Sequence, residues 1–269
     1  MARPFSSDLT VGEAFVVREA GVTPIAQVMG SSVYRVGWQT MPWGARGWGI
    51  SLQAGETFEL ETQTAAWNEA RSLALGRLRD EAVAVGADAV VGMRLTRGGY
   101  EWGGDLVEFV AIGTAVRLDR FELDVAPVIS HLSGQDFAKL VRHGLWPVGI
   151  VAGSTIAYVA AGWGQQSRVS GMFSGRQNQE LPDYTQGLYD ARELAMARVS
   201  REAHALHAHG VVGVTIDRRE HTRERDVGGT TYTDLVIELH VLGTAIVEVR
   251  HDAPAPEKFL ALPLQQESS

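Results

Sequence analysis

The sequence carries one pattern twice, and this internal repeat constrains the fold more than any other feature. Residues 67–95, WNEARSLALGRLRDEAVAVGADAVVGMRL, align without a gap with residues 188–216, LYDARELAMARVSREAHALHAHGVVGVTI, at an offset of 121. In both copies apolar residues recur at spacings of three and four, which predicts a helix with one buried face. A glycine and a short apolar run follow, as expected for a helix that leads into a buried strand. The predicted buried faces are Trp67, Ala70, Ala74, Leu78, Ala82 and Val85, and Leu188, Ala191, Ala195, Val199, Ala203 and Leu206.

Two charged pairs also recur on the predicted helices, Arg77 with Glu81 and Arg198 with Glu202. They lie on the flank of the apolar stripe, four residues apart. Such pairs are usually solvated and stabilise a helix by only about 0.3 kcal/mol, so we expect both to face water.

The repeat extends in both directions. Upstream, SDLTVGEAFVVREAG matches SHLSGQDFAKLVRHG at an offset of 123, with Thr10 and Ser133 placed as N-caps of short helices. Downstream, LVEFVAIGTAVRL matches VIELHVLGTAIVEV at an offset of 130, which predicts a second strand in each copy. The change of offset puts nine extra residues into DRREHTRERDVGGTTYTD, which we expect to be a charged loop projecting into solvent.

Each copy therefore has the order short helix, strand, irregular segment, long helix, strand, hairpin, strand. This order predicts an α+β fold in which one long helix packs on an antiparallel sheet. We expect a first unit over residues 1–122 and a second over residues 123–250. Residues 251–269 contain three prolines and a polar end, which is typical of a disordered tail.

Composition excludes several classes of partner and site. The net charge of −8 argues against nucleic acid and against an anionic membrane surface. The chain has no cysteine, which excludes disulfides and thiolate metal sites. Residues 145–163 are uncharged, but Pro147, Gly149 and Gly153 favour strands over a membrane-spanning helix. The first ten residues contain no apolar signal region, so we expect a cytoplasmic protein.

Tryptophans cluster in a glycine-rich segment between the first strand and the long helix of copy one. Trp38, Trp43 and Trp48 lie within GWQTMPWGARGWG. Clustered tryptophans can form a ligand-stacking surface. Because aromatic residues are enriched at interfaces, we favour packing between copies or subunits.

The best candidate metal ligands are His204, His207 and His209 in EAHALHAHG. Imidazole suits zinc, copper or nickel, and residues i and i+3 can converge on one face of a helix. The alternative interpretation, which we favour, is that the histidines interact with the partial negative charge at a helix C-terminus. His240 replaces Val110 of the first copy, and we expect it to be an interface residue or a core histidine with satisfied hydrogen bonds, rather than a metal ligand.

Recognised catalytic motifs are absent from the sequence. It contains no P-loop, no GxGxxG between a strand and a helix, no GxSxG and no HExxH. No carboxylate pair stands out as a general acid and base. We therefore assign no catalytic and no cofactor-binding residue.

The run EAR…A…RL…EA…GADAVVGMRL, followed by EFVAIGTAV, resembles the YbjQ-like family, which is labelled "putative heavy-metal-binding". The resemblance covers both copies, from about Gln27 and Val148 onward, and the added N-terminal helix is similar to an extension of double-domain actinobacterial relatives. It implies dodecin-like β-α-β-β units, and pentameric rings for single-domain members. A tandem chain can then form a ring of double units, or a ring in which each copy contributes its own layer.

These observations lead to one main functional hypothesis. We expect a non-enzymatic homo-oligomer, a pentamer-like ring with a binding or scaffold role, that binds a divalent metal ion (zinc, copper or nickel) or a small ligand. One alternative is an enzyme of unknown reaction with a site between copies or subunits. The other is a membrane-associated partner protein.

Overall fold

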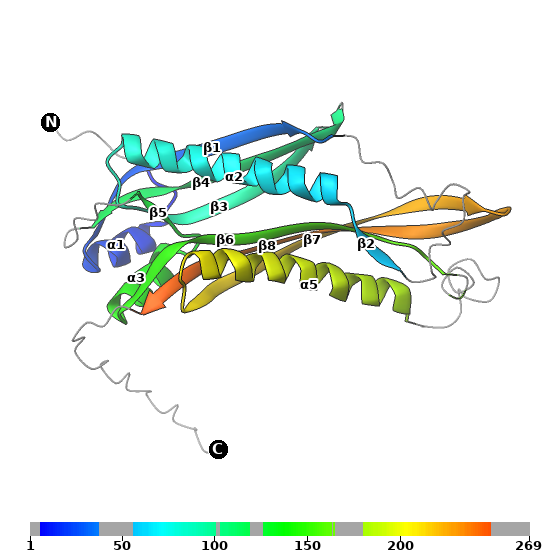
Figure 1. Ribbon diagram of the computed structural model, residues 1–269. Helices are drawn as coiled ribbons and strands as arrows, with labels where there is room; N and C mark the ends of the chain where they lie inside the picture. Colours follow the sequence, from blue (N-terminus) through cyan, green and yellow to red (C-terminus); the bar gives the residue numbers. More distant parts are fainter. Residues whose placement is uncertain are drawn as a thin grey trace, which may run out of the picture.

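The computed structural model describes residues 6–37, 56–100, 103–118, 126–162, 164 and 180–248. The first half contains α1 (Val11–Glu19), β1 (Val22–Arg35), β2 (Thr57–Glu59), α2 (Glu61–Ala84), β3 (Ala89–Tyr100) and β4 (Gly103–Leu118). The second half contains β5 (Val128–Ile129), α3 (Gly134–Arg142), β6 (Leu145–Val159), α5 (Pro182–Ala205), β7 (Gly210–Val227) and β8 (Thr230–Glu248). The predicted repeat and the α+β class are confirmed (Figure 1).

The short helices begin where their caps predict. Thr10 accepts a hydrogen bond from the backbone N–H of Glu13 and forms a complete capping box with that residue. The side chain of Ser133 caps α3 by accepting a hydrogen bond from the backbone N–H of Asp136. Three segments discussed above lie outside the described residues: the Trp38, Trp43 and Trp48 cluster, the predicted unit boundary at residue 122, and the tail at residues 251–269.

Each half builds a three-stranded antiparallel sheet that a short strand of the other half completes. The strand orders are β1-β4-β3-β5 and β2-β6-β8-β7. β5 belongs to the second half but pairs in parallel with β3, and β2 belongs to the first half but pairs antiparallel with β6. The two halves are therefore joined by an exchange of strands.

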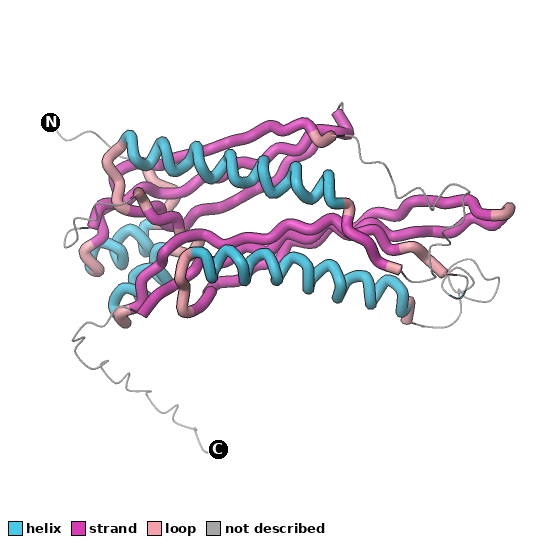
Figure 2. Tube along the Cα trace, viewed as in Figure 1, coloured by secondary structure: helices cyan, strands magenta, loops and turns pink. Residues whose placement is uncertain are grey.

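The two long helices lie on the same side of the sheets and run in the same direction (Figures 1 and 2). α2 packs on β1 and α5 packs on β6. Both contacts are close because a glycine of the strand lies under the helix. A Cβ atom added to Gly30 would lie 2.1 Å from the Ala74 carbonyl oxygen. One added to Gly153 would lie 2.2 Å from the Ala195 carbonyl oxygen.

The charged segment expected to be a loop is instead a regular extension of the β7–β8 hairpin. The two strands stay paired from Asp217 opposite His240 to Val227 opposite Thr230. They are joined by Gly228 and Gly229, whose φ values of 59° and 82° suit the type I′ turn of two-residue hairpins. The expected exposure of this segment is confirmed, and the hairpin projects beyond the other strands (Figure 1).

The uncharged segment forms strand β6 over Leu145–Val159, as Pro147 and the glycines of the segment predict. Among the helices described in this chain, none is long and apolar enough to cross a membrane.

Candidate functional site at the junction of the two halves

The first turns of α2 cover the outer edge of β6 and continue its hydrogen bonding. The side chain of Asn68 accepts from the N–H of Ser154 and donates to its carbonyl, both at 3.2 Å. Four residues earlier, the Thr64 hydroxyl accepts from the N–H of Ile156 at 3.0 Å, and the N–H of Leu60 donates to the Ile156 carbonyl at 2.7 Å. Because Leu60, Thr64 and Asn68 are four residues apart, they share one face of the helix. The helix side thus replaces a neighbouring strand beyond β2.

A buried arginine lies under this seam. Arg71 is 5% exposed and donates to the Ser154 hydroxyl at 3.2 Å and to the Asn68 amide oxygen at 2.7 Å. Its guanidinium pairs with Glu202 of the second half at 3.1 Å, and the other oxygen of Glu202 accepts from the N–H of Ala152 at 2.7 Å. Burial lowers the pKa of Arg71, and Glu202 opposes that shift. A guanidinium nevertheless stays charged in proteins, so Glu202 supplies the countercharge that makes its burial tolerable.

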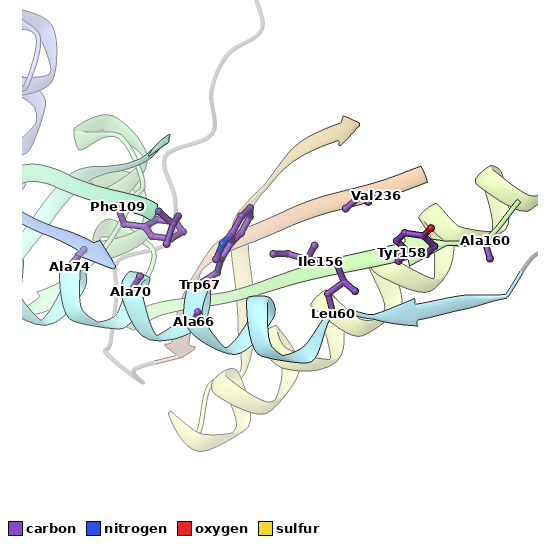
Figure 3. Close-up of a cluster of buried hydrophobic side chains, with 11 residues drawn as sticks. Leu60, Ala66, Trp67, Ala70, Ala74, Phe109, Ile156, Tyr158, Ala160 and Val236 are labelled. Atoms are coloured by element: carbon purple, nitrogen blue, oxygen red, sulfur yellow. The ribbon is translucent and has the colours of Figure 1, made fainter. Parts of the chain in front are cut away.

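His240 fills the apolar part of the junction. Its ring stacks on Trp67 at 4.9 Å between centroids and meets the edge of Phe109 at 5.8 Å. Trp67 and Phe109 belong to a cluster in which side chains of both halves pack together, including Leu60, Ile156 and Tyr158 (Figure 3). The expectation that His240 is an interface residue is therefore confirmed.

The environment of His240 keeps its ring neutral. Burial, followed by the nearby charges of Arg97, Arg71 and Arg219, lowers the pKa of His240 to about 3. Nδ1 lies 2.8 Å from the Ser154 hydroxyl, and Nε2 has no partner among the described residues. A serine bonded to a histidine has the composition of a nucleophile and its base. With a pKa near 3 and Ser154 only 1% exposed, this pair does not provide a base near neutral pH.

Two further ion pairs cross the junction. Arg97 of β3 pairs with Glu238 of β8 at 2.6 Å and lies over the Trp67 ring at 4.5 Å. Arg198 of α5 pairs with Glu59 of β2 at 2.8 Å. The expectation that Arg198 and Glu202 form a solvated pair on the helix flank is wrong, because each binds across the junction.

Their counterparts in the first half are also bound to a strand. Arg77 donates to the Ser31 carbonyl at 2.5 Å, and Glu81 accepts from the N–H of Met29 at 2.7 Å. The recurrence of these charges reflects the close approach of helix and strand at Gly30 and Gly153. At those places, backbone N–H and C=O groups on the outer edge of the strand have no strand partner among the described residues and are hydrogen-bonded by side chains of the helix.

A cleft of about 560 Å³ lies between the first half of α2 and the last turns of α5. Its lining includes Glu59, Asn68, Arg71, Arg198, Arg201 and Glu202. Arg71 and Arg198 are already paired with carboxylates that line the same cleft. The junction is thus organised to hold two units together.

A second buried polar cluster fixes the base of the long hairpin. Asp234 is fully buried and binds Arg225 through two hydrogen bonds, at 2.5 and 3.0 Å. It also accepts from the Tyr158 hydroxyl and from the N–H of Ala161. The hydrogen bond to Asp234 raises the pKa of Arg225, whereas burial followed by Asp234 raises that of Tyr158.

The predicted histidine ligands lie at the end of α5 with separate partners. Nδ1 of His204 contacts the Ser200 carbonyl at 2.6 Å, and Nδ1 of His209 accepts from the N–H of Glu248 at 3.0 Å. His207 has a φ of 50° and takes the left-handed position that Gly86 occupies after α2. Within the described part of the chain, no three His, Cys, Asp or Glu residues are grouped to hold a metal ion. The histidines therefore do not fit a preformed metal centre as they stand, and metal binding by them remains a prediction.

Asn68 and Arg97 of the junction do not stand out in the sequence. Asn68 aligns with Tyr189, and Arg97 with Arg218. For Asn68 the available signal was this divergence between copies, because a position that changes while its surroundings repeat has a different neighbour in each half. Arg97 is an arginine in both copies and gives no such signal.

The matches to known proteins also divide the chain into two halves. Residues 50–119 and 146–249 match the YbjQ family, described as "putative heavy-metal-binding". The encapsulin nanocompartment protein Rv1762c of Mycobacterium tuberculosis is 41% identical over 218 residues, covering 79% of this chain and 77% of the relative. Shorter matches include a UPF0145 protein of Clostridium perfringens, 45% identical over 58 residues (22% of this chain and 53% of the relative). UPF0145 protein TTHA1944 of Thermus thermophilus is 40% identical over 67 residues, covering 25% of this chain and 55% of the relative.

The two matched stretches fall on the two halves of the structure, each with its long helix and its antiparallel sheet. The chain therefore belongs to the YbjQ family and contains two copies of the family's domain.

Proposed function

We propose that this protein is a non-enzymatic, ring-forming homo-oligomer with a scaffold role in the cytoplasm. The observation that supports this proposal is the incomplete exchange of strands. Inside the chain each half completes the other's sheet, yet within the described residues no strand pairs with the outer edges of β1 and β7. Long open sheet edges invite pairing with another chain, and an oligomer would satisfy both.

The arrangement of the halves supports a ring of double units over a ring with two layers. α2 and α5 run in the same direction on the same side of the sheets (Figure 1), as neighbours around one rotation axis would. We further propose that each half is a dodecin-like unit and that the ring resembles the pentamers of single-domain members.

The M. tuberculosis relative is named an encapsulin nanocompartment protein. By extension we propose that rings of this chain contribute to a nanocompartment. The binding role, for zinc, copper, nickel or a small ligand, is a second part of the proposal, with His204, His207 and His209 as the metal ligands. Their place on the exposed end of α5 gives a metal access from solvent.

Native mass spectrometry of the purified full chain, with elemental analysis of the same sample, tests both parts. We expect a defined oligomer of several chains at micromolar concentration, and a monomer would contradict the scaffold role. If metal is bound, the double variant His204→Ala, His207→Ala should lose it. Unchanged metal content in that variant would refute the histidine site, and no uptake of added zinc, copper or nickel would refute the metal-binding role.

A further inference from the structure

The junction inside the chain has unoccupied counterparts at both outer ends of the molecule. We propose that a second copy of this chain binds there, so that the contact between halves is repeated, head to tail, between chains. The inference rests on the proposed oligomeric function and names the surfaces that carry it. The head surface consists of Val11 and Phe15 of α1 with Met29 and Val33 of β1. The tail surface consists of α3, the outer edge of β7 and the start of α5.

The head surface is apolar and exposed at positions whose repeat counterparts are buried in the junction. Phe15 is 67% exposed and Val33 is 54% exposed, whereas their counterparts Ala138 and Ile156 are 0% and 1% exposed. Val11 and Met29 follow the same pattern, with Gly134 and Ala152 as buried counterparts. Exposed apolar patches of this kind mark interaction sites, and here the internal junction shows which surface covers them.

The tail surface shows the complementary pattern. Val214 and Ile216 of β7 are 43% and 48% exposed. Their counterparts in β3, Met93 and Leu95, are 1% exposed and half-buried, and both belong to the core.

Beside them lies an apolar groove of about 390 Å³ whose lining includes Leu132, Leu140, Leu145 and Val212. In the first half the counterparts of these four residues are Leu9, Val17, Val22 and Val91. There Phe137 of α3 packs among them. The groove is therefore the unfilled version of a site that is filled inside the chain. The repeat counterpart of Phe137 is the smaller Ala14, so on α1 of a second copy the neighbouring exposed side chains Val11 and Phe15 would fill the groove.

Backbone hydrogen bonds give this contact a register. In the junction, Ser130 donates to the Val90 carbonyl at 2.8 Å and accepts from the N–H of Met93 at 3.0 Å, while the Leu132 carbonyl accepts from Gly92 at 2.9 Å. By the repeat, Ser7 and Leu9 of a second copy would bind Val211, Val214 and Gly213 on β7. The segment that would bind is already in place. Ser7 contacts the Thr114 hydroxyl at 3.2 Å, just as Ser130 contacts that of Thr244 at 3.3 Å.

The edge of β1 can receive the start of α5 in the same way. Leu60 and Thr64, which bind Ile156 across the junction, align with Leu181 and Thr185, and Ile156 aligns with Val33. The third residue of that seam differs, because Asn68 aligns with Tyr189, which is 63% exposed. Between chains the amide would be replaced by a large aromatic side chain suited to covering Met29 and Val33.

Charge at the helix ends also fits a repeated contact. Across the junction Glu19 of α1 pairs with Arg142 of α3 at 3.6 Å, and these two residues occupy the same position of the repeat. A second copy would place its own Glu19 toward Arg142, so opposite charges would again meet.

Head and tail are different surfaces, so their contact is heterologous and continues until a ring closes. A closed ring then contains an even number of units, two for each chain, so a pentamer-like ring of this protein consists of five chains rather than five units.

Two substitutions of exposed residues test this arrangement without disturbing the core: Phe15→Glu on the head surface and Val214→Glu on the tail surface. The control is Val83→Glu, because Val83 is 55% exposed and its counterpart His204 is also exposed. Size-exclusion chromatography with light scattering gives the size of each protein, and circular dichroism confirms that each is folded.

We expect the wild type and Val83→Glu to form the same oligomer, and Phe15→Glu and Val214→Glu to be single chains. When these two are mixed, the intact tail of one and the intact head of the other should form a two-chain complex and nothing larger. If both variants keep the wild-type size, the inference is overturned while the oligomeric function stands. If both variants are single chains that do not combine when mixed, the head-to-tail arrangement is also overturned. A monomeric wild type would overturn the inference and the proposed function together.

Discussion

The substitution Gly30→Ala tests the close contact between α2 and β1 on which each unit is built. A methyl group at this position would lie 2.1 Å from the Ala74 carbonyl oxygen and 2.3 Å from the Leu78 amide nitrogen. Both are backbone atoms of α2, so the helix must move away by roughly 1 Å to restore normal contact distances. Overpacking of a core costs about 1–3 kcal/mol. We expect about 3 kcal/mol, because moving α2 also strains the hydrogen bonds of Arg77 and Glu81 to β1.

The matched control is Gly76→Ala in the same helix. No atom lies within 4 Å of a Cβ at Gly76, and alanine is favoured over glycine inside a helix by about 1 kcal/mol. The two variants should therefore differ by about 4 kcal/mol in the free energy of unfolding, with opposite signs relative to wild type. Urea unfolding followed by circular dichroism measures this, at one protein concentration because assembly contributes to stability. A Gly30→Ala protein as stable as wild type would refute the packing argument.

Three further predictions concern the buried polar groups. Because the pKa of His240 is about 3 in the folded chain and about 6.5 when unfolded, the unfolded state binds the extra proton between these values. Stability should then fall by up to about 1.4 kcal/mol for each pH unit as the pH drops from 6.5 to 3. Over this range the urea unfolding midpoint should depend less on pH in His240→Phe than in the wild type. Equal dependence in the two proteins would contradict the low pKa of His240. Arg71→Ala should destabilise the chain by about 2 kcal/mol, because it removes the charged hydrogen bonds to Asn68, Ser154 and Glu202 at the junction. Arg71→Lys should not restore wild-type stability, since an ammonium cannot reproduce the fork of hydrogen bonds; full restoration in urea unfolding would show that charge alone matters. Asp234→Asn should speed hydrogen exchange in the β7–β8 hairpin, because it removes the charge that holds Arg225; unchanged exchange would show that the hairpin is fixed by its backbone pairing.

The repeat made the main elements of the fold predictable. Apolar periodicity located both long helices, and the Thr10 and Ser133 caps located the short ones. The long hairpin was misjudged because its residues are charged rather than alternately apolar. Its pairing is set by the two-residue Gly228–Gly229 turn and the register that this turn imposes.

The exchange of strands could not be predicted from periodicity. β2 and β5 are three and two residues long, too short to show an alternating pattern. The same limit applied to the junction, since Asn68 and Arg71 read as ordinary polar residues of an amphipathic helix. Only the proximity of β6 gives Asn68 a strand edge to bind.

Because the chain has no cysteine, disulfide crosslinking between two introduced cysteines can test directly whether the head and tail surfaces meet between chains. Across the junction, a Cβ at Gly134 would lie 3.2 Å from the Cβ of Glu13, close to the separation found in disulfides. The repeat counterparts of these positions are Val11 on the head surface and Asp136 on the tail surface. Mild oxidation of the double variant Val11→Cys, Asp136→Cys, followed by a non-reducing denaturing gel, reports whether the two meet between chains.

We expect a ladder of covalent oligomers that ends at the size of the ring, and no ladder from a Val83→Cys, Asp136→Cys control. Recovery of single chains only, from a protein that is oligomeric before oxidation, would contradict the claim that the junction between halves is repeated between chains.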